Sequence, residues 1–142
     1  MIREISQFVE DMTHGYFTIG VNLFVGYLPL EDRSGGPVPD KLAVLLENAG
    51  AEVIGQLPDY AGKMIQVWNR AHDFWEARED AYVIYDVLHG AAGWKLPTLV
   101  SGSKVYLAMT IDARSEPAPI SNPDAQGYFV FSTNYIFRIE SP

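Results

Sequence analysis

The residues that come closest to forming a chemical site in this sequence are His72, Asp73 and Glu76. His72 and Glu76 are four residues apart, a spacing that places two side chains on one face of a helix, where they could hold a metal ion. A small acidic enzyme or ligand-binding α+β domain that uses these three residues is therefore one hypothesis. Asp73 with Glu76 three positions later is also the residue pattern of a helix start. The spacing predicts no further metal ligand, and we expect Asp73 to cap a helix.

Other catalytic motifs are absent from the sequence. His14 and His89 stand alone, and the chain has no cysteine, which excludes disulfides, cysteine-ligated zinc and thiol catalysis. No Gly-x-Ser-x-Gly motif, phosphate-binding loop or dinucleotide-binding glycine motif occurs. We expect the adjacent carboxylates at 31–32 and 79–80 to solvate a loop and a helix face. The sequence therefore predicts a protein that is not an enzyme, with no catalytic residue, metal or cofactor.

The charge balance is acidic. The formal net charge is −8, from 18 acidic and 10 basic side chains. The sequence has no cluster of lysines and arginines, so we expect no direct sequence-specific binding of nucleic acid. The charge would suit a partner with a basic face. No apolar run approaches the roughly 20 residues that a membrane-spanning helix needs, so we expect no membrane contact.

Two helices are predicted by the spacing of the apolar residues. The first covers residues 2–12, where apolar side chains recur every three or four positions. The second covers residues 74–89, with Asp73 as its cap and Gly90 just past its end. Small alanines at 77 and 81 would let this helix lie close to a sheet.

Strands are predicted where apolar and polar residues alternate or where apolar residues form short runs. The segments are 19–27, 41–46, 64–69, 105–113 and 128–139, with weaker signals at 52–54 and 96–100 and a turn at 49–51. Both faces of 128–139 are apolar, which indicates a central strand. The last two strands would form an antiparallel hairpin. We expect a single domain over residues 1–142, of the α+β class, with a mixed, mostly antiparallel sheet packed against two main helices.

Two proline-rich loops, residues 28–40 and 114–127, are the best interface candidates, because proline lowers the entropy that a loop loses on binding. The polar residues in and beside these loops that we expect at an interface are Glu31, Asp32, Arg33, Arg70, Arg114, Glu116, Asn122 and Asp124. Arg70 would either bridge a strand end to the helix start or face a partner. The tryptophans at 68, 75 and 94 belong either to the core or to an interface.

The order of several short motifs resembles a known family. These motifs are the run Val67–Ala77, the run Ala81–Gly90, the loop Pro117–Ile120 leading to Asp124, the strand Tyr128–Tyr135, and the segment Leu23–Pro29. Together they resemble the tail-terminator (minor capsid) proteins of long-tailed bacteriophages, over residues 1–140. One departure is Asn48-Ala49-Gly50, where the family pattern has Gly-Gly.

The resemblance implies a structural virion protein that assembles as a homo-hexameric ring. Such a ring caps the head-proximal end of the tail tube, stops tail polymerisation and forms the surface for head–tail joining. Its partners would be other copies of itself, the major tail tube protein and the head–tail connector protein. It would be made in the cytoplasm of a host bacterium and would reside in the virion. No catalytic residue or cofactor belongs to this role.

The resemblance leaves the position in the virion open. A head–tail connector subunit is the alternative to a terminator. For the terminator ring, we expect the loops 29–40 and 114–127 to project from the sheet and contact the axial partners. Deletion of residues 32–38 should then leave the fold intact and weaken tube capping.

Overall fold

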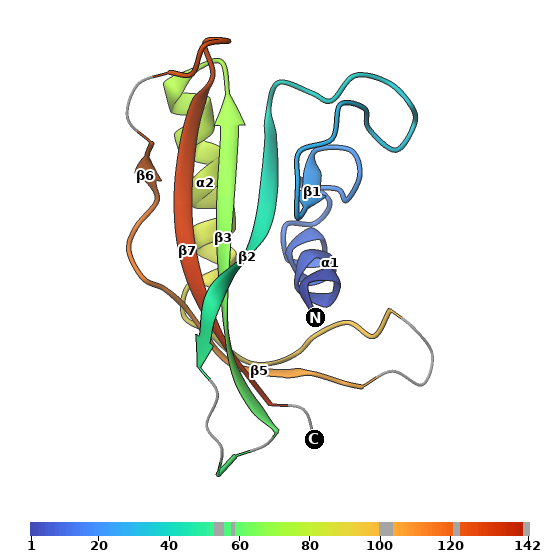
Figure 1. The fold of residues 1–142 in the computed structure, drawn as a ribbon, viewed down its shortest axis with the longest axis vertical. Coiled ribbons are helices and arrows are strands. Elements are labelled where there is room, and N and C mark those ends of the chain that lie inside the picture. The colour runs from blue at the N-terminus through green and yellow to red at the C-terminus, as the bar shows by residue number, and fades with distance from the viewer. Residues whose placement is uncertain (53–55, 58, 100–103, 121–122, 141–142) are drawn as a thin grey trace.

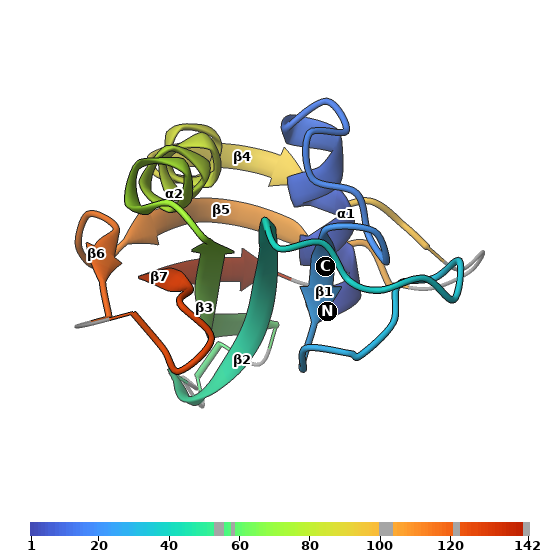
Figure 2. The same cartoon turned by 90° about the horizontal axis from the view of Figure 1, so that it is seen from above.

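The computed structural model of the chain describes residues 1–52, 56–57, 59–99, 104–120 and 123–140. Its two helices are α1 (Ile2–Met12) and α2 (Phe74–Leu88), both packed on one face of a curved sheet (Figures 1 and 2). The strands are β1 (Leu23–Val25), β2 (Leu42–Glu52), β3 (Tyr60–Ala71), β4 (Ala91–Lys95), β5 (Leu107–Ala113), β6 (Ala118–Pro119) and β7 (Phe129–Glu140).

The sheet has seven strands in the order β1-β2-β3-β7-β5-β4, with β6 also paired to β7. Only β1 and β2 are parallel, and the other pairs are antiparallel. The α+β class and the mostly antiparallel sheet are confirmed. The sheet is larger than expected, because β4 forms in a segment read as turn-rich and β6 forms within the second proline-rich loop, where no strand was predicted. The predicted central position of β7 and its antiparallel pairing with β5 are also confirmed.

Each helix forms where its apolar spacing predicts. Ile5, Phe8 and Val9 of α1 are buried against the sheet. In α2 the buried residues include Ala77, Ala81, Ile84 and Leu88, and the alanines bring the helix close to β3 and β7. The start of α2 is fixed by Asp73, whose Oδ2 accepts a hydrogen bond from the Glu76 backbone N–H at 3.1 Å. This is the cap that the sequence predicted.

The strands β3 and β7 pair over their whole length and give the sheet two different faces. Ile65 and Val67 of β3, with Tyr135 and Phe137 of β7, point to the helices and are fully buried. Trp68 directly follows Val67, so its side chain points to the other side of the sheet, where it lies beside Val44 of β2 and Ser132 of β7. We call this side the outer face. Within the described residues, no helix packs on it (Figure 2).

Three strand predictions were wrong in extent or position. The strand predicted over 19–27 shrinks to β1, because Gly20 has φ +79° and the Asn22 side chain closes a turn by accepting from the Thr18 N–H at 2.7 Å. β2 runs on through the turn predicted at 49–51. The strand predicted near 96–100 is β4 instead, placed earlier by its pairing with β5. Part of the weak signal at 52–54 lies outside the described residues.

Candidate protein–protein interface

One cluster of polar and aromatic side chains ties together three segments at one end of the sheet. Its members are Asp40, Arg70, His72, Asp124 and Tyr128, and we call it the Tyr128 clasp. The Tyr128 ring lies between two cationic or ionisable groups: the Arg70 guanidinium is 4.0 Å from its centroid, and the His72 ring stacks on it at 4.1 Å. The Asp124 carboxylate accepts from the Tyr128 N–H at 2.9 Å. The residue missed by the sequence analysis is therefore the tyrosine at the centre.

Asp40 links this cluster to the end of the loop 28–40. The Tyr128 hydroxyl donates to its Oδ1 at 2.7 Å, and His72 Nε2 lies 3.5 Å from the same oxygen. The hydrogen bond to Asp40 raises the pKa of Tyr128. Arg70 donates to the backbone carbonyls of Pro39 and Asp40 at 3.1 and 3.2 Å. Arg70 thus bridges β3 to the loop, which is a structural role, and not to the start of α2 as one alternative held.

The loop 28–40 is internally ordered. The Asp32 carboxylate accepts from the Ser34 hydroxyl at 2.6 Å and from the Ser34 and Gly36 N–H groups at 2.9 and 3.0 Å. The Ser34 hydroxyl is the main cause of the lowered pKa of Asp32. The backbone of Arg33 bonds to Gly20, and Glu31 pairs with Pro37. A loop held in this way loses little entropy on binding a partner.

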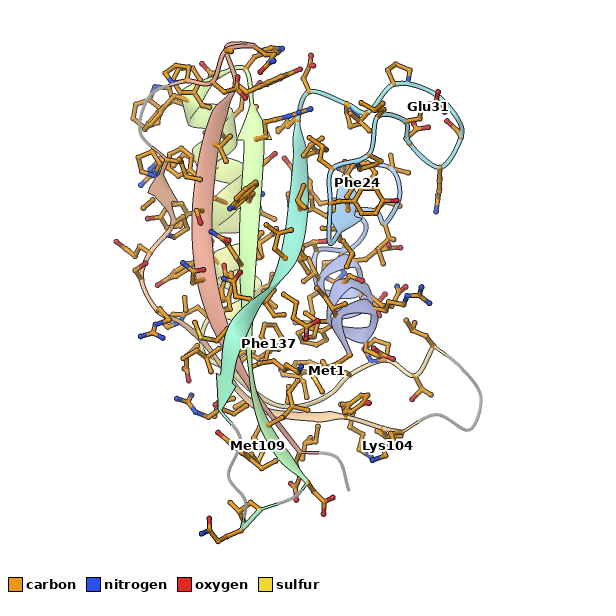
Figure 3. All side chains as sticks on the ribbon, viewed as in Figure 1. Met1, Phe24, Glu31, Lys104, Met109 and Phe137 are labelled. Carbon is orange, nitrogen blue, oxygen red and sulfur yellow. The ribbon has the colours of Figure 1, made fainter. Side chains whose placement is uncertain are left out.

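This loop carries one apolar side chain that is almost entirely exposed. Leu30 is 93% exposed, next to Glu31, which Figure 3 labels at the edge of the molecule. Isolated exposed leucines are common, but this one stands in an ordered loop, just before the bridge between Glu31 and Pro37 and close in sequence to the exposed Tyr27 and Leu28. The sequence analysis selected the charged residues of the loop and missed the leucine.

A shallow hollow of about 360 Å³ lies on the outer face. It is lined by Gly26, Tyr27, Leu28, Leu42, Val44, Leu46, Trp68, Arg70, Asp124 and Val130. Two predicted interface residues, Arg70 and Asp124, meet at this hollow, and Trp68 stands within it with 39% of its surface exposed. An apolar, aromatic floor with charged residues at the side is the usual composition of a protein–protein contact.

The other predicted interface residues lie apart. Arg114 follows β5, and its Nη1 lies 4.0 Å from Met64 Sδ, near the middle of β3. Glu116 is exposed just before β6. Asn122 lies outside the described residues. The first part of the second proline-rich loop therefore lies away from the first loop, because β6 holds residues 118–119 against β7, whereas Asp124 further along meets the first loop at the hollow.

The three residues of the enzyme hypothesis have separate structural tasks. His72 belongs to the Tyr128 clasp, Asp73 caps α2, and Glu76 takes part in that cap through its backbone N–H. All three side chains are exposed. Among the described residues, no three histidine or carboxylate side chains are grouped as a metal ion would require. In the same part of the chain, no helix combines the length and apolar character needed to span a membrane.

The expectation that Asp80 would solvate a helix face is wrong. Asp80 is buried at 1% exposure, where the Tyr16 hydroxyl donates to it at 2.6 Å and Lys41 Nζ lies 3.4 Å away. The hydrogen bond to Asp80 raises the pKa of Tyr16, and the hydrogen bond to Tyr16 raises the pKa of Lys41. This triad ties α2 to the segment after α1 and to the start of β2.

The fold is similar to that of a chain in a solved virion. The match is to the "Virion of native gene transfer agent (GTA) particle", with a TM-score of 0.56 and 14% sequence identity, and it covers 94% of this chain and 84% of that chain. At this identity the likeness shows a shared fold. Comparisons with protein-family models and with curated protein sequences gave no match.

Proposed function

We propose that this chain is a structural protein of a phage-like virion, and that it caps the head-proximal end of the tail tube as a homo-hexameric ring. In this role it stops tail polymerisation and forms the surface for head–tail joining. The observation that carries the proposal is the likeness in fold, along 94% of the chain, to a chain of a gene transfer agent virion. The order of the motifs in the sequence gives the finer assignment to the terminator.

The shape of the subunit fits a part with two different axial partners. The ordered loop 28–40 and the Tyr128 clasp lie at one end of the long axis (Figure 1). Leu57 and Met109 line a second hollow, of about 220 Å³, and Figure 3 labels Met109 at the other end. We assign the tail tube protein and the head–tail connector protein as the partners of these two ends, within a virion assembled in the host cytoplasm. No catalytic residue, metal or cofactor enters this role.

The test is a deletion in the loop 28–40. The structure narrows the deletion to residues 32–36, because Pro37 pairs with Glu31 and Val38 packs against Phe24, Leu42 and Val44. The shortened protein should keep its circular dichroism spectrum and lose the ability to stop elongation of purified tail tubes. The wild-type protein should stop it at about one ring per tube end.

The matched control is Leu57→Ser, which changes an exposed leucine at the other end of the molecule. If the deletion variant caps tubes at wild-type concentrations, the loop is not the tube contact. If the wild-type protein binds isolated connectors and ignores tubes, the connector alternative replaces the terminator. If it binds neither, the proposed function is wrong.

A further inference from the structure

Two exposed aromatic surfaces on this chain lie on different sides of the sheet. The first is the hollow of the outer face, with Trp68 and Tyr27. The second follows α2, on the other side of the sheet (Figure 2). We infer that in the ring, α2 of one copy packs into the outer face of the next copy. This inference rests on the proposed function and names the two subunit surfaces that the function requires.

The exposed flank of α2 carries a stripe of aromatic and cationic side chains. The stripe consists of Trp75, Arg78, Tyr82, Tyr85 and His89, which alternate at spacings of three and four residues. This spacing sets side chains in one row along a helix, as in the contact seam of a coiled coil. The buried stripe of Ala77, Ala81, Ile84 and Leu88 is separate from it. α2 therefore has more apolar surface than its own sheet covers.

Contacts within the stripe hold its side chains in place before any partner binds. The Arg78 guanidinium lies 4.6 Å from the centroid of the Tyr82 ring, Tyr82 and Tyr85 meet edge to face at 5.5 Å, and Tyr85 stacks on His89 at 5.0 Å. Trp75, at the start of the helix, is 61% exposed. Tyr82 and Tyr85 are half-buried, and tryptophan and tyrosine side chains held in a fixed arrangement are typical centres of protein–protein contacts.

The charges of the two surfaces are complementary. Arg70 and Arg114 reach the outer face, and within the described residues neither forms an ion pair with a carboxylate. Beside the stripe, α2 exposes Glu76, Glu79 and Asp86, which likewise form no ion pair in the described part of the chain. Bringing the two surfaces together would set these carboxylates near guanidinium groups that form no ion pair in the described part of the isolated subunit.

A second copy of this chain is the occupant that fits both observations. A closed ring needs a head-to-tail contact between two unlike surfaces of the same subunit. Each copy presents an aromatic helix with exposed carboxylates on one side of the sheet, and on the other side an apolar hollow lined by Arg70 and Asp124. The loops at the two ends of the long axis then stay free for the axial partners.

The test uses two variants that each disable one surface, Trp68→Asp and Trp75→Asp. In native mass spectrometry and sedimentation, each variant alone should remain a monomer, with self-association weakened at least about tenfold. An equimolar mixture should form heterodimers and nothing larger, because one intact helix still meets one intact outer face. The matched control Leu99→Asp, at an exposed leucine outside both surfaces, should assemble like the wild type.

Cysteine cross-linking covers the case in which Trp68→Asp does not fold. The natural chain has no cysteine, so Ser132→Cys on the outer face and Glu79→Cys on α2 have no background. The double variant, alone and on tail tubes, should oxidise to a ladder that ends at the ring size, whereas each single variant should give dimers at most. Absence of the ladder in both conditions, or ring assembly by both tryptophan variants, overturns the contact.

The outcomes separate this contact from the proposed function. If the ladder forms and the ring ignores tail tubes, the contact stands and the terminator role fails. If wild-type protein and both tryptophan variants cap tubes equally well, the role stands and the contact fails.

Discussion

At the scale of single residues, Tyr128 holds the loop 28–40 to the sheet. Its ring lies between Arg70 and His72, and its hydroxyl bonds to Asp40. We predict that Tyr128→Leu removes all three contacts and speeds hydrogen exchange of the backbone amides around Asp40 and Asp124. Mass spectrometry of the exchanging peptides measures the effect.

Tyr128→Phe is the control for this prediction. It keeps the ring between Arg70 and His72 and loses only the bond to Asp40. Exchange should therefore rise in the order wild type, Tyr128→Phe, Tyr128→Leu. Equal exchange in all three proteins would show that the contacts around this ring do not restrain the loop.

The triad of Tyr16, Lys41 and Asp80 predicts a loss of stability at alkaline pH. The pKa values of Tyr16 and Lys41 are raised above 10.0 and 10.5, so the folded chain binds these protons more tightly than the unfolded chain. Their contribution is complete below pH 10.0 and is lost as the pH rises through the folded values. Burial raises the pKa of Tyr135 in the same direction.

Thermal unfolding from pH 8 upward at constant ionic strength checks this prediction. The melting temperature should fall above pH 10.0, and the fall should be smaller in the double variant Tyr16→Phe, Lys41→Met. Tyr27→Phe is the matched control, because this tyrosine is 68% exposed. A pH profile of the double variant identical to that of wild type would contradict the assignment.

At the scale of elements, α2 begins where the Asp73 side chain caps it. Asp73→Ala should lower the free energy of unfolding by about 1 kcal/mol, since the Glu76 N–H loses its acceptor. Urea denaturation measures the change. Glu76→Ala should leave stability nearly unchanged, because Glu76 contributes only its backbone N–H. A larger loss from Glu76→Ala than from Asp73→Ala would reject the capping role.

The elements that the sequence predicted well have their own local signals. Both helices combine a 3.6-residue apolar period with an end signal, and β7 is a twelve-residue segment rich in aromatic and β-branched residues. Alternation alone misled at residues 19–22, because the Gly20 turn continues the same pattern without being a strand. The sequence Ala91-Ala92-Gly93 of β4 has almost no strand signal, and this strand forms because it pairs with β5.

The candidate site was predictable only in part. The sequence marked the loop 28–40 and the residues Arg70 and Asp124, which meet at the hollow of the outer face. It did not mark Tyr128 or Leu30, because a contact between residues 40, 70 and 128 depends on strand register. Once β3 is known to alternate, Val67 and Trp68 must face opposite sides, so the register also decides that Trp68 belongs to the outer face.

At the scale of the whole molecule, the net charge of −8 predicts how binding responds to salt. A partner with a basic face would be attracted over about 10 Å at 0.1 M salt and less at higher salt. Cosedimentation with tail tubes at increasing sodium chloride should therefore show weaker binding. The same series with potassium glutamate in place of sodium chloride checks whether the weakening depends on the type of ion. Binding that is unchanged or stronger at high salt would indicate an apolar contact with the tube.

The central position of β7 also governs when the sheet can close during synthesis. The β1-β2-β3 half and the β5-β4 half of the sheet do not pair with each other, and β7 joins them. Both halves precede β7 in the chain, so during synthesis the sheet stays in two parts until residues 129–140 leave the ribosome. An incomplete chain would lack part of the outer face and the strand on which α2 packs. The two parts of the sheet therefore become one only after β7 has been made, however early each part folds.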